Sequence, residues 1–364
     1  MRRRVFGLSD RSVEFEQRGF RGASAAMRNR LEQVGRAFLA GYHLALDCGS
    51  LQELGSRLNS VDGELRGFAF EGAAMGLALL DFLTPWRCGR VAQFLQGAGA
   101  AHAYMIHVGV GWIWARVPFG FRRRRSRLDP LLGWLAFDGW GFHEGYFQWP
   151  KYVAGQPPPG KLRGYERRVF DQGLGRSFWF VHGGNAGLIA QTMANFPAVR
   201  QADLWSGVGL AAAYAGWADE ETLRDLRVLA GQFQPQLAQG AAFAAKARQR
   251  AGNVADYNQF AVQMLCDSTV AEAARVADTA LESFSMSRSL GPRHGLFQYQ
   301  IPHRRAVPEA GIPAAPLTAP VEVQSRKSDS CEETTEPGYE IWRQRIQKHF
   351  QTHFLPLQLL ENAK

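Results

Sequence analysis

Two near-identical tetrapeptides each place a carboxylate inside an apolar, glycine-containing segment of this chain. They are Ala69-Phe70-Glu71-Gly72 and Ala136-Phe137-Asp138-Gly139. An ionised carboxylate that is removed from water costs several kcal/mol unless it is paired or neutralised. A chain that buries two such acids therefore needs either partners for them in its core or a chemical use for them.

The two acid segments belong to a longer repeat. A Gly-x-Gly segment with large aromatic residues behind it begins 37 positions after Gly72, and another begins 34 positions after Gly139. A weaker third copy has His182 in the place of the acid. Self-similarity in a fixed order indicates duplicated units that bury each other's apolar faces. The Gly-x-Gly segments are residues 109–111, 173–175 and 207–209.

Apolar residues recur at helical spacing along most of the chain, and no long stretch alternates polar with apolar residues. β-Branched residues are also few beside Ala, Leu and Gly. We therefore predict an all-α protein whose residues 1–284 form one compact multi-helix domain with internal repeats. Helices are expected at 24–46, 51–58, 64–83, 87–96, 100–117, 130–147, 165–180, 186–195, 198–215, 220–233, 238–250 and 255–284.

The composition changes after this domain. Residues 285–337 gather Pro, Ser, Thr and charged residues, and such a segment cannot bury enough apolar surface to order itself, so we expect a disordered linker. Residues 338–364 predict a short amphipathic helix, because Trp342, Ile346 and Phe350 recur every four positions. This helix is expected to dock on the core or on a partner.

Charge and cysteine content exclude several classes of protein. The net charge of +9 is mostly arginine charge, and its one dense cluster, residues 122–125, reads as a loop with no nucleic-acid-binding motif around it, so we predict no nucleic-acid partner. Four scattered cysteines fit a reducing compartment better than a disulfide framework. The basic N-terminus lacks the apolar core of a signal peptide. We therefore expect a cytoplasmic protein.

One segment resembles a membrane span. Residues 98–117 are about long enough to cross a bilayer, and the arginine cluster follows them as a cytoplasmic flank would. Two histidines and several glycines argue against a span, and a helix buried among other helices has the same hydropathy. Membrane association, including peripheral contact, stays an open alternative.

Polar residues of the repeat region are the candidates for chemistry. In an aromatic pocket, loss of water would raise the pKa of Glu71 or Asp138 and provide a proton donor at neutral pH, with nearby histidines as partners. The histidine spacing does not match a helical metal pair, so no metal site is predicted. Buried hydrogen bonds to Arg, Tyr or backbone are the competing interpretation. The candidate catalytic residues are Glu71, Asp138, His107, His143, Glu144 and His182.

Large aromatic side chains around these groups would suit an extended apolar or conjugated ligand, and glycine would allow its close approach. The same side chains would equally fill the core of a large helical domain. The Gly-x-Gly segments lack the preceding strand of a dinucleotide site, so no cofactor is assigned. The candidate substrate-binding residues are Trp112, Trp114, Trp140, Phe142, Tyr146, Trp179, Gly109 and Gly139.

Several segments, taken together, resemble the UnbL-type enediyne biosynthesis proteins, domain-of-unknown-function family 1702. The likeness covers roughly residues 1–284 and consists of distinct motifs in a fixed order. The matching segments are 4–9 (RVFGLS), 68–76 (FAFEGAAMG), 107–112 (HVGVGW), 137–145 (FDGWGFHEG), 182–185 (HGGN), 203–209 (DLWSGVG) and 240–248 (GAAFAAKAR).

The resemblance implies a setting in natural product biosynthesis. Proteins of this family accompany the iterative polyketide synthase that makes a linear polyene, and they are thought to help turn that polyene into the enediyne core. The family supplies no established catalytic residues. We therefore expect an accessory protein that acts on a hydrophobic polyene or acyl intermediate, alongside partner biosynthetic proteins. Two alternatives stay open. One is a tailoring enzyme, and the other is a non-catalytic scaffold or membrane-associated partner that binds a lipid or another biosynthetic protein.

Overall fold

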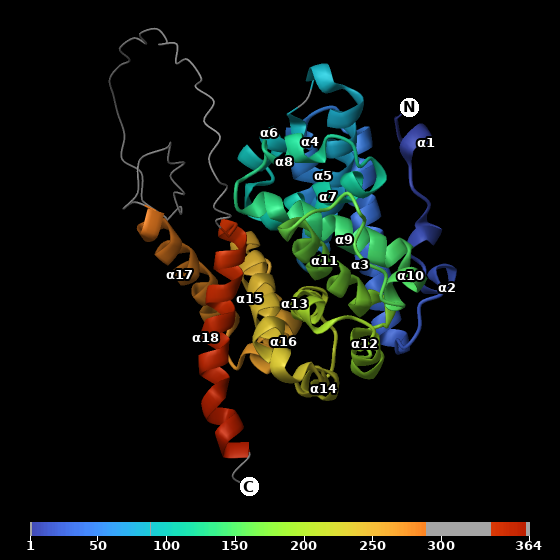
Figure 1. The fold of residues 1–364 in the computed structure, drawn as a ribbon. Helices are drawn as coiled ribbons and strands as arrows, with labels where there is room; N and C mark the ends of the chain where they lie inside the picture. The colour runs from blue at the N-terminus through green and yellow to red at the C-terminus, as the bar shows by residue number, and fades with distance from the viewer. Residues whose placement is uncertain (1, 88, 289–335, 362–364) are drawn as a thin grey trace.

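The structure, a computed structural model, describes residues 2–87, 89–288 and 336–361, and all regular structure within these ranges is helical (Figure 1). The predicted all-α class is confirmed. The long central helices are α3 (Ala25–Asp47), α5 (Gly63–Leu83), α7 (Ala103–Arg116), α9 (Leu135–Phe147), α11 (Tyr165–Val181), α13 (Ala198–Ala215) and α15 (Gln234–Ala251). The others are α1 (Arg2–Phe6), α2 (Phe15–Arg18), α4 (Leu51–Asn59), α6 (Arg90–Gln96), α8 (Phe121–Arg125), α10 (Trp149–Val153), α12 (Ala186–Met193), α14 (Glu220–Ala230), α16 (Asp256–Cys266), α17 (Val270–Arg288) and α18 (Gly338–Glu361).

The helix boundaries follow local sequence signals. Ser24 begins α3, because its side chain accepts a hydrogen bond from the backbone N–H of Met27. Asp62 caps α5 in the same way through the N–H of Glu64. Helix α5 ends at Leu83, just before Thr84 and Pro85, where the proline disfavours helical geometry in the residue before it.

The central helices pack against one another in chain order, from α3 to α15. Neighbouring helices cross at glycines that touch the facing backbone. A Cβ added to Gly139 would lie 1.9 Å from the carbonyl oxygen of Val108 on α7, and one added to Gly141 would lie 1.9 Å from that of Phe170 on α11. Only hydrogen fits at such contacts. The first glycine of each pair thus faces the preceding helix and the second faces the following one. The same arrangement holds for Gly109 and Gly111, Gly173 and Gly175, and Gly207 and Gly209.

The structure shortens the predicted repeat unit to a single helix. Helix α9 carries both an acid and a Gly-x-Gly pair, so the acid and glycine segments are not separate halves of a unit. His182 does not take the acid's place in a third copy, because it ends α11 instead of lying at a crossing. The position before the first crossing glycine is polar and buried on most of these helices. Its occupants are Glu71, Asp138, Gln172, Ser206 and Gln239.

The C-terminal part differs from the prediction in two places. The helix expected at 255–284 is two helices, α16 and α17, because Asp267 turns the chain with a positive φ of 50°. Residues 285–288 continue α17, and the rest of the predicted linker, residues 289–335, lies outside the described residues. Helix α18 docks on the core: it runs beside α15 and α17, and Tyr339 and Trp342 are buried in the same hydrophobic cluster as the central helices (Figure 1).

The arginine cluster is also better ordered than predicted. Residues 122–125 lie in helix α8, where Arg124 stacks over the Phe82 ring and Arg125 over the Trp134 ring. In the part of the chain that the structure describes, no helix combines the length and the apolar character that crossing a membrane requires. Residues 98–117, the segment that resembles a membrane span, contain α7, which is buried between α5 and α9.

Candidate functional site

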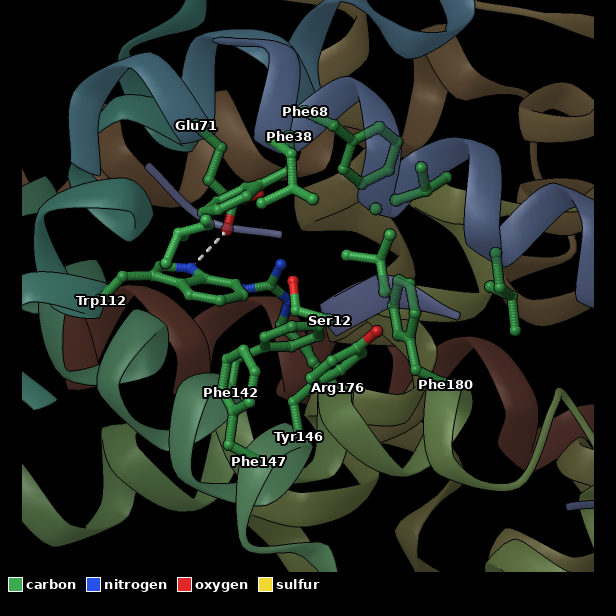
Figure 2. A pocket seen from close by; sticks show the side chains of 16 residues that line it. Ser12, Phe38, Phe68, Glu71, Trp112, Phe142, Tyr146, Phe147, Arg176 and Phe180 are labelled. Atoms are coloured by element: carbon green, nitrogen blue, oxygen red, sulfur yellow. Dashed lines mark hydrogen bonds between the residues drawn. The ribbon is translucent and has the colours of Figure 1, made fainter. Parts of the chain in front are cut away.

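An apolar cavity lies between the N-terminal segment and helices α3, α5, α7, α9 and α11 (Figure 2). Its volume is about 40 Å³, which is room for a few water molecules. Glu71 and Arg176 are the charged groups among its lining residues. The lining consists of Leu8, Ser12, Val13, Leu31, Val34, Gly35, Phe38, Leu39, Phe68, Glu71, Trp112, Phe142, Tyr146, Phe147, Arg176 and Phe180.

Glu71 is the acid of this cavity. It sits on α5 and is only 3% exposed, and the indole Nε1 of Trp112 donates a hydrogen bond of 3.0 Å to its Oε1 (Figure 2). Burial raises the pKa of Glu71 to about 7, against the opposing effects of Arg176 and the Trp112 hydrogen bond. The shift has the direction predicted for an acid in an aromatic pocket. Glu71 can therefore both give and accept a proton near neutral pH.

Asp138 has a different environment. It is fully buried on α9, outside the cavity lining, and forms an ion pair with Nη1 of Arg176. Gln172 donates to its other carboxylate oxygen at 2.8 Å and also contacts the hydroxyl of Tyr339 on α18. A fully partnered buried acid fits the competing interpretation, in which hydrogen bonds and charge pairing satisfy the carboxylate.

Arg176 interacts electrostatically with both acids, and it was not predicted from the sequence. It lies on α11, pairs with Asp138 through Nη1 and lines the cavity near Glu71. Burial lowers the pKa of Arg176, but the negative charges of Asp138 and Glu71 outweigh that effect and keep the group cationic. The sequence did contain a signal for Arg176 as a site residue: like Glu71, it is a charged residue beside a crossing glycine in an apolar segment.

The predicted histidines and Glu144 do not join Glu71 at the cavity. His107 Nδ1 lies 2.7 Å from the carbonyl oxygen of Ala103, and His182 Nε2 lies 2.7 Å from the hydroxyl of Thr192. The Nε–H of Arg116 donates a hydrogen bond of 3.3 Å to His143 Nε2. The His143 ring also contacts the Trp112 indole edge-on, with 5.7 Å between the ring centroids. Burial lowers the pKa of all three histidines. These three rings are accordingly neutral at neutral pH.

Glu144 lies beside His143, with 3.7 Å between its Oε1 and the ring Nδ1. Within the described residues, no three His, Cys, Asp or Glu side chains are grouped so that they could hold a metal ion.

The predicted binding residues divide into two groups. Trp112, Phe142 and Tyr146 line the cavity. The remaining aromatic candidates fill the core elsewhere, and the two glycines lie at helix crossings, where they face backbone and not a ligand. Those outside the lining are Trp114, Trp140, Trp179, Gly109 and Gly139. Aromatic lining residues that the sequence analysis missed are Phe38, Phe68, Phe147 and Phe180.

Residues 7–14, here called the N-terminal cover, close one side of the cavity with Leu8, Ser12 and Val13. Two hydrogen bonds to α3 hold this cover in place, one within the cover and one at the residue before it. The backbone N–H of Leu8 donates to His43 Nε2 at 3.1 Å, and the Tyr42 hydroxyl donates to the carbonyl of Phe6 at 2.8 Å. The sequence predicted no such element, because the cover contains only a short 3₁₀ turn, Asp10–Val13.

Comparison with known proteins gives one match. The model of a family described as "Protein of unknown function (DUF1702)" matches residues 1–304. The match thus extends past residue 284, where the sequence resemblance was expected to end. No curated protein and no solved structure matches the chain.

Proposed function

The chain belongs to this family of unknown function, DUF1702, and we propose that it is an accessory biosynthetic protein that binds a linear polyene or polyketide intermediate at the Glu71 cavity and protonates it. One observation carries the proposal: Glu71 is a carboxyl group with a pKa of about 7 among apolar and aromatic side chains. An acid whose pKa lies near the working pH is suited to general acid catalysis. The sequence resemblance to UnbL-type enediyne proteins supports the class of ligand.

The neighbours of Glu71 suit the proposed step. When Glu71 gives its proton to an unsaturated carbon of the ligand, a carboxylate remains in the cavity. This carboxylate then takes a proton from another carbon of the ligand, so that a double bond shifts and no charge is left on the ligand. The Trp112 N–H already donates to that carboxylate, and the positive charge of Arg176 acts on it as well. Fixed donors of this kind stabilise a charge that develops during a reaction in an apolar site.

A long ligand requires the cavity to open. Pockets for drug-sized ligands typically measure about 300–1,000 Å³, much more than the 40 Å³ present in the structure. The N-terminal cover is the element that we propose to move. It contributes Leu8, Ser12 and Val13 to the cavity wall. Single hydrogen bonds, from Leu8 to His43 and from Tyr42 to the adjoining Phe6, hold it against α3.

The test uses purified full-length protein and conjugated polyenes in D₂O. Wild type is expected to retain a polyene and to transfer deuterium to it, which mass spectrometry detects. Glu71→Gln is expected to retain the polyene without deuterium transfer. Glu144→Gln is the matched control, because Glu144 lies outside the cavity lining and should leave transfer unchanged. Failure of wild type to retain any polyene would overturn the proposal.

A second candidate function, a membrane-associated partner protein, rests on a separate surface. Trp86 and Phe119 are 77% and 76% exposed, although large aromatic side chains are usually buried. Trp86 follows α5 in the sequence and Phe119 precedes α8. These two helices are in contact, because Arg124 of α8 stacks on Phe82 at the end of α5. Aromatic and basic side chains together favour the surface of an anionic membrane. Sedimentation with vesicles tests this function: binding to neither anionic nor neutral vesicles would refute it.

A further inference from the structure

Two hydrogen-bond donors near Glu71 lack an acceptor. Within the described residues, the Nε–H of Arg176 and the hydroxyl of Tyr214 are buried polar groups without a hydrogen-bond partner. Arg176 is 4% exposed and Tyr214 is 2% exposed, so neither group reaches bulk solvent. A buried donor that stays unpaired lowers the stability of the folded state. These two donors are therefore available to an acceptor atom of a ligand.

Both donors are held in place by their surroundings. The ion pair with Asp138 fixes one side of the Arg176 guanidinium, and its Cζ lies 5.0 Å from the centroid of the Phe142 ring. Figure 2 shows this guanidinium group reaching toward the Glu71–Trp112 pair. The side chain is therefore already positioned for a ligand, and Nε does not need a change in the ion pair to become available.

Tyr214 lies on α13, beside this region and outside the cavity lining. Its ring contacts the cavity residue Phe68 edge-on at 5.2 Å, and its hydroxyl blocks the space beside Gly67, one helical turn before Glu71. Burial raises the pKa of Tyr214 to about 12, so the hydroxyl keeps its proton and remains a donor. Arg176 and Tyr214 thus offer donors next to an acid that is itself a donor when protonated.

The charges decide what kind of group these donors can bind. Asp138 already pairs with the charge of Arg176, and Glu71 is neutral when protonated, so these three groups together carry little net charge. The remaining lining is almost entirely apolar. We infer that Arg176 and Tyr214 bind the oxygenated end, a carbonyl or a carboxylate, of an otherwise hydrocarbon chain. This inference rests on the proposed function and adds to it the chemistry and the direction of the bound chain.

Three fluorescent probes test the inference with the full-length protein. They are cis-parinaric acid, its methyl ester, and diphenylhexatriene, which is conjugated but contains no oxygen. We expect wild type to bind the acid or the ester at least about tenfold more tightly than diphenylhexatriene, because hydrogen bonds to a charged group are among the stronger ones in proteins. Tight binding of both oxygenated probes would indicate a carbonyl ligand, and tight binding of the acid alone would indicate a carboxylate.

Two variants identify the residues responsible. Arg176→Lys keeps the charge that pairs with Asp138 but removes Nε, and Tyr214→Phe removes only the unpartnered hydroxyl. Each should lower the preference for oxygenated probes while leaving diphenylhexatriene affinity unchanged. Tyr152→Phe is the matched control, since Tyr152 is a buried tyrosine outside the cavity lining. The thermal midpoint of each variant verifies folding.

The outcomes separate this inference from the proposed function. If wild type binds none of the three probes, the proposed function fails. If it binds all three equally, or if the preference survives in both Arg176→Lys and Tyr214→Phe, polyene binding stands and the assignment of the oxygenated end is overturned.

Discussion

The proton on Glu71 makes stability depend on pH in a defined direction. Its pKa rises from 4.5 to about 7 on folding, so the folded state binds more protons than the unfolded state between these values, and stability falls as pH rises through this window. The loss amounts to about 3 kcal/mol. Glu71→Gln cannot ionise, and its amide oxygen can still accept the Trp112 hydrogen bond. Urea unfolding should therefore find Glu71→Gln more stable than wild type by about 3 kcal/mol at pH 8 and similar near pH 4.5. An equal pH dependence of the two proteins would show that Glu71 is not perturbed.

Substitution of Asp138 should act in the opposite direction. Asp138→Asn leaves the buried Arg176 without its ion partner, and breaking such a pair costs about 3–5 kcal/mol. We expect a corresponding fall in the free energy of unfolding at pH 7. The double variant Asp138→Asn with Arg176→Met should regain much of it, because no unpaired charge remains. A single variant as stable as wild type would contradict the structural role given to Asp138.

These two acids show what the sequence could predict about the site. Burial of both followed from their apolar neighbours, and burial is the largest cause of the raised pKa of Glu71. Which acid would receive Arg176 depends on how α9 and α11 cross, a tertiary relation that no local pattern encodes. The residues of the N-terminal cover were missed for the same reason, since they reach the cavity only through contacts with α3.

At the scale of helices, the crossing glycines should tolerate no side chain. Gly139→Ala would place a Cβ 1.9 Å from the Val108 carbonyl oxygen and push α7 and α9 apart. Overpacking of a core commonly costs about 1–3 kcal/mol, and we expect a loss at or above the upper end because the obstacle is backbone. Gly63→Ala is the control: nothing lies within 4 Å of its added Cβ, so stability should stay equal or rise slightly. Thermal unfolding of both variants decides the matter, and an unchanged midpoint for Gly139→Ala would exclude close crossing.

The N-terminal cover should loosen in acid. Leu8 donates its N–H to His43 Nε2, which requires that nitrogen to be unprotonated. Burial and Arg3 lower the pKa of His43 below 6.5, although Asp10 and Asp47 oppose the shift. The unfolded or detached state therefore binds the proton more readily, and the contact weakens as pH falls below about 6.5. Hydrogen exchange should show lower protection of the Leu8 amide at pH 5.5 than at pH 7.5, after correction for intrinsic rates. His43→Ala should lose that protection at both values, and a pH-independent protection factor in wild type would refute the mechanism.

At the scale of the whole molecule, the positions of individual helices could be predicted from the sequence. The packing of the central helices α3 to α15 against one another in chain order, here called the array, could not. The helical spacing of apolar residues located most central helices within a few residues, because this signal is contained in a short segment. The role of glycine was interpreted only in general terms as close approach. Its alternation between the preceding and the following helix became visible only once the helices were placed side by side.

Helix α18 closes the far end of the array, and its removal should destabilise the whole protein. Four large side chains of α18, those of Tyr339, Trp342, Ile346 and Phe350, are at most 1% exposed, and Arg343 donates to the buried Asp203 at 2.7 Å. Burial of one such apolar side chain contributes about 1.5–3 kcal/mol, so together they account for at least about 6 kcal/mol, comparable with the total stability of many domains.

A chain that ends at residue 337 should therefore lose near-ultraviolet circular dichroism from its tryptophans and bind a hydrophobic dye. A synthetic peptide of residues 336–361 should restore the signal when added, because α18 supplies a preformed set of contacts to an exposed surface. Gln351→Ala in the full chain is the control, since this residue lies on the exposed face of α18 and should have little effect. A truncated chain with native dichroism and an unchanged unfolding midpoint would show that the array is complete without α18.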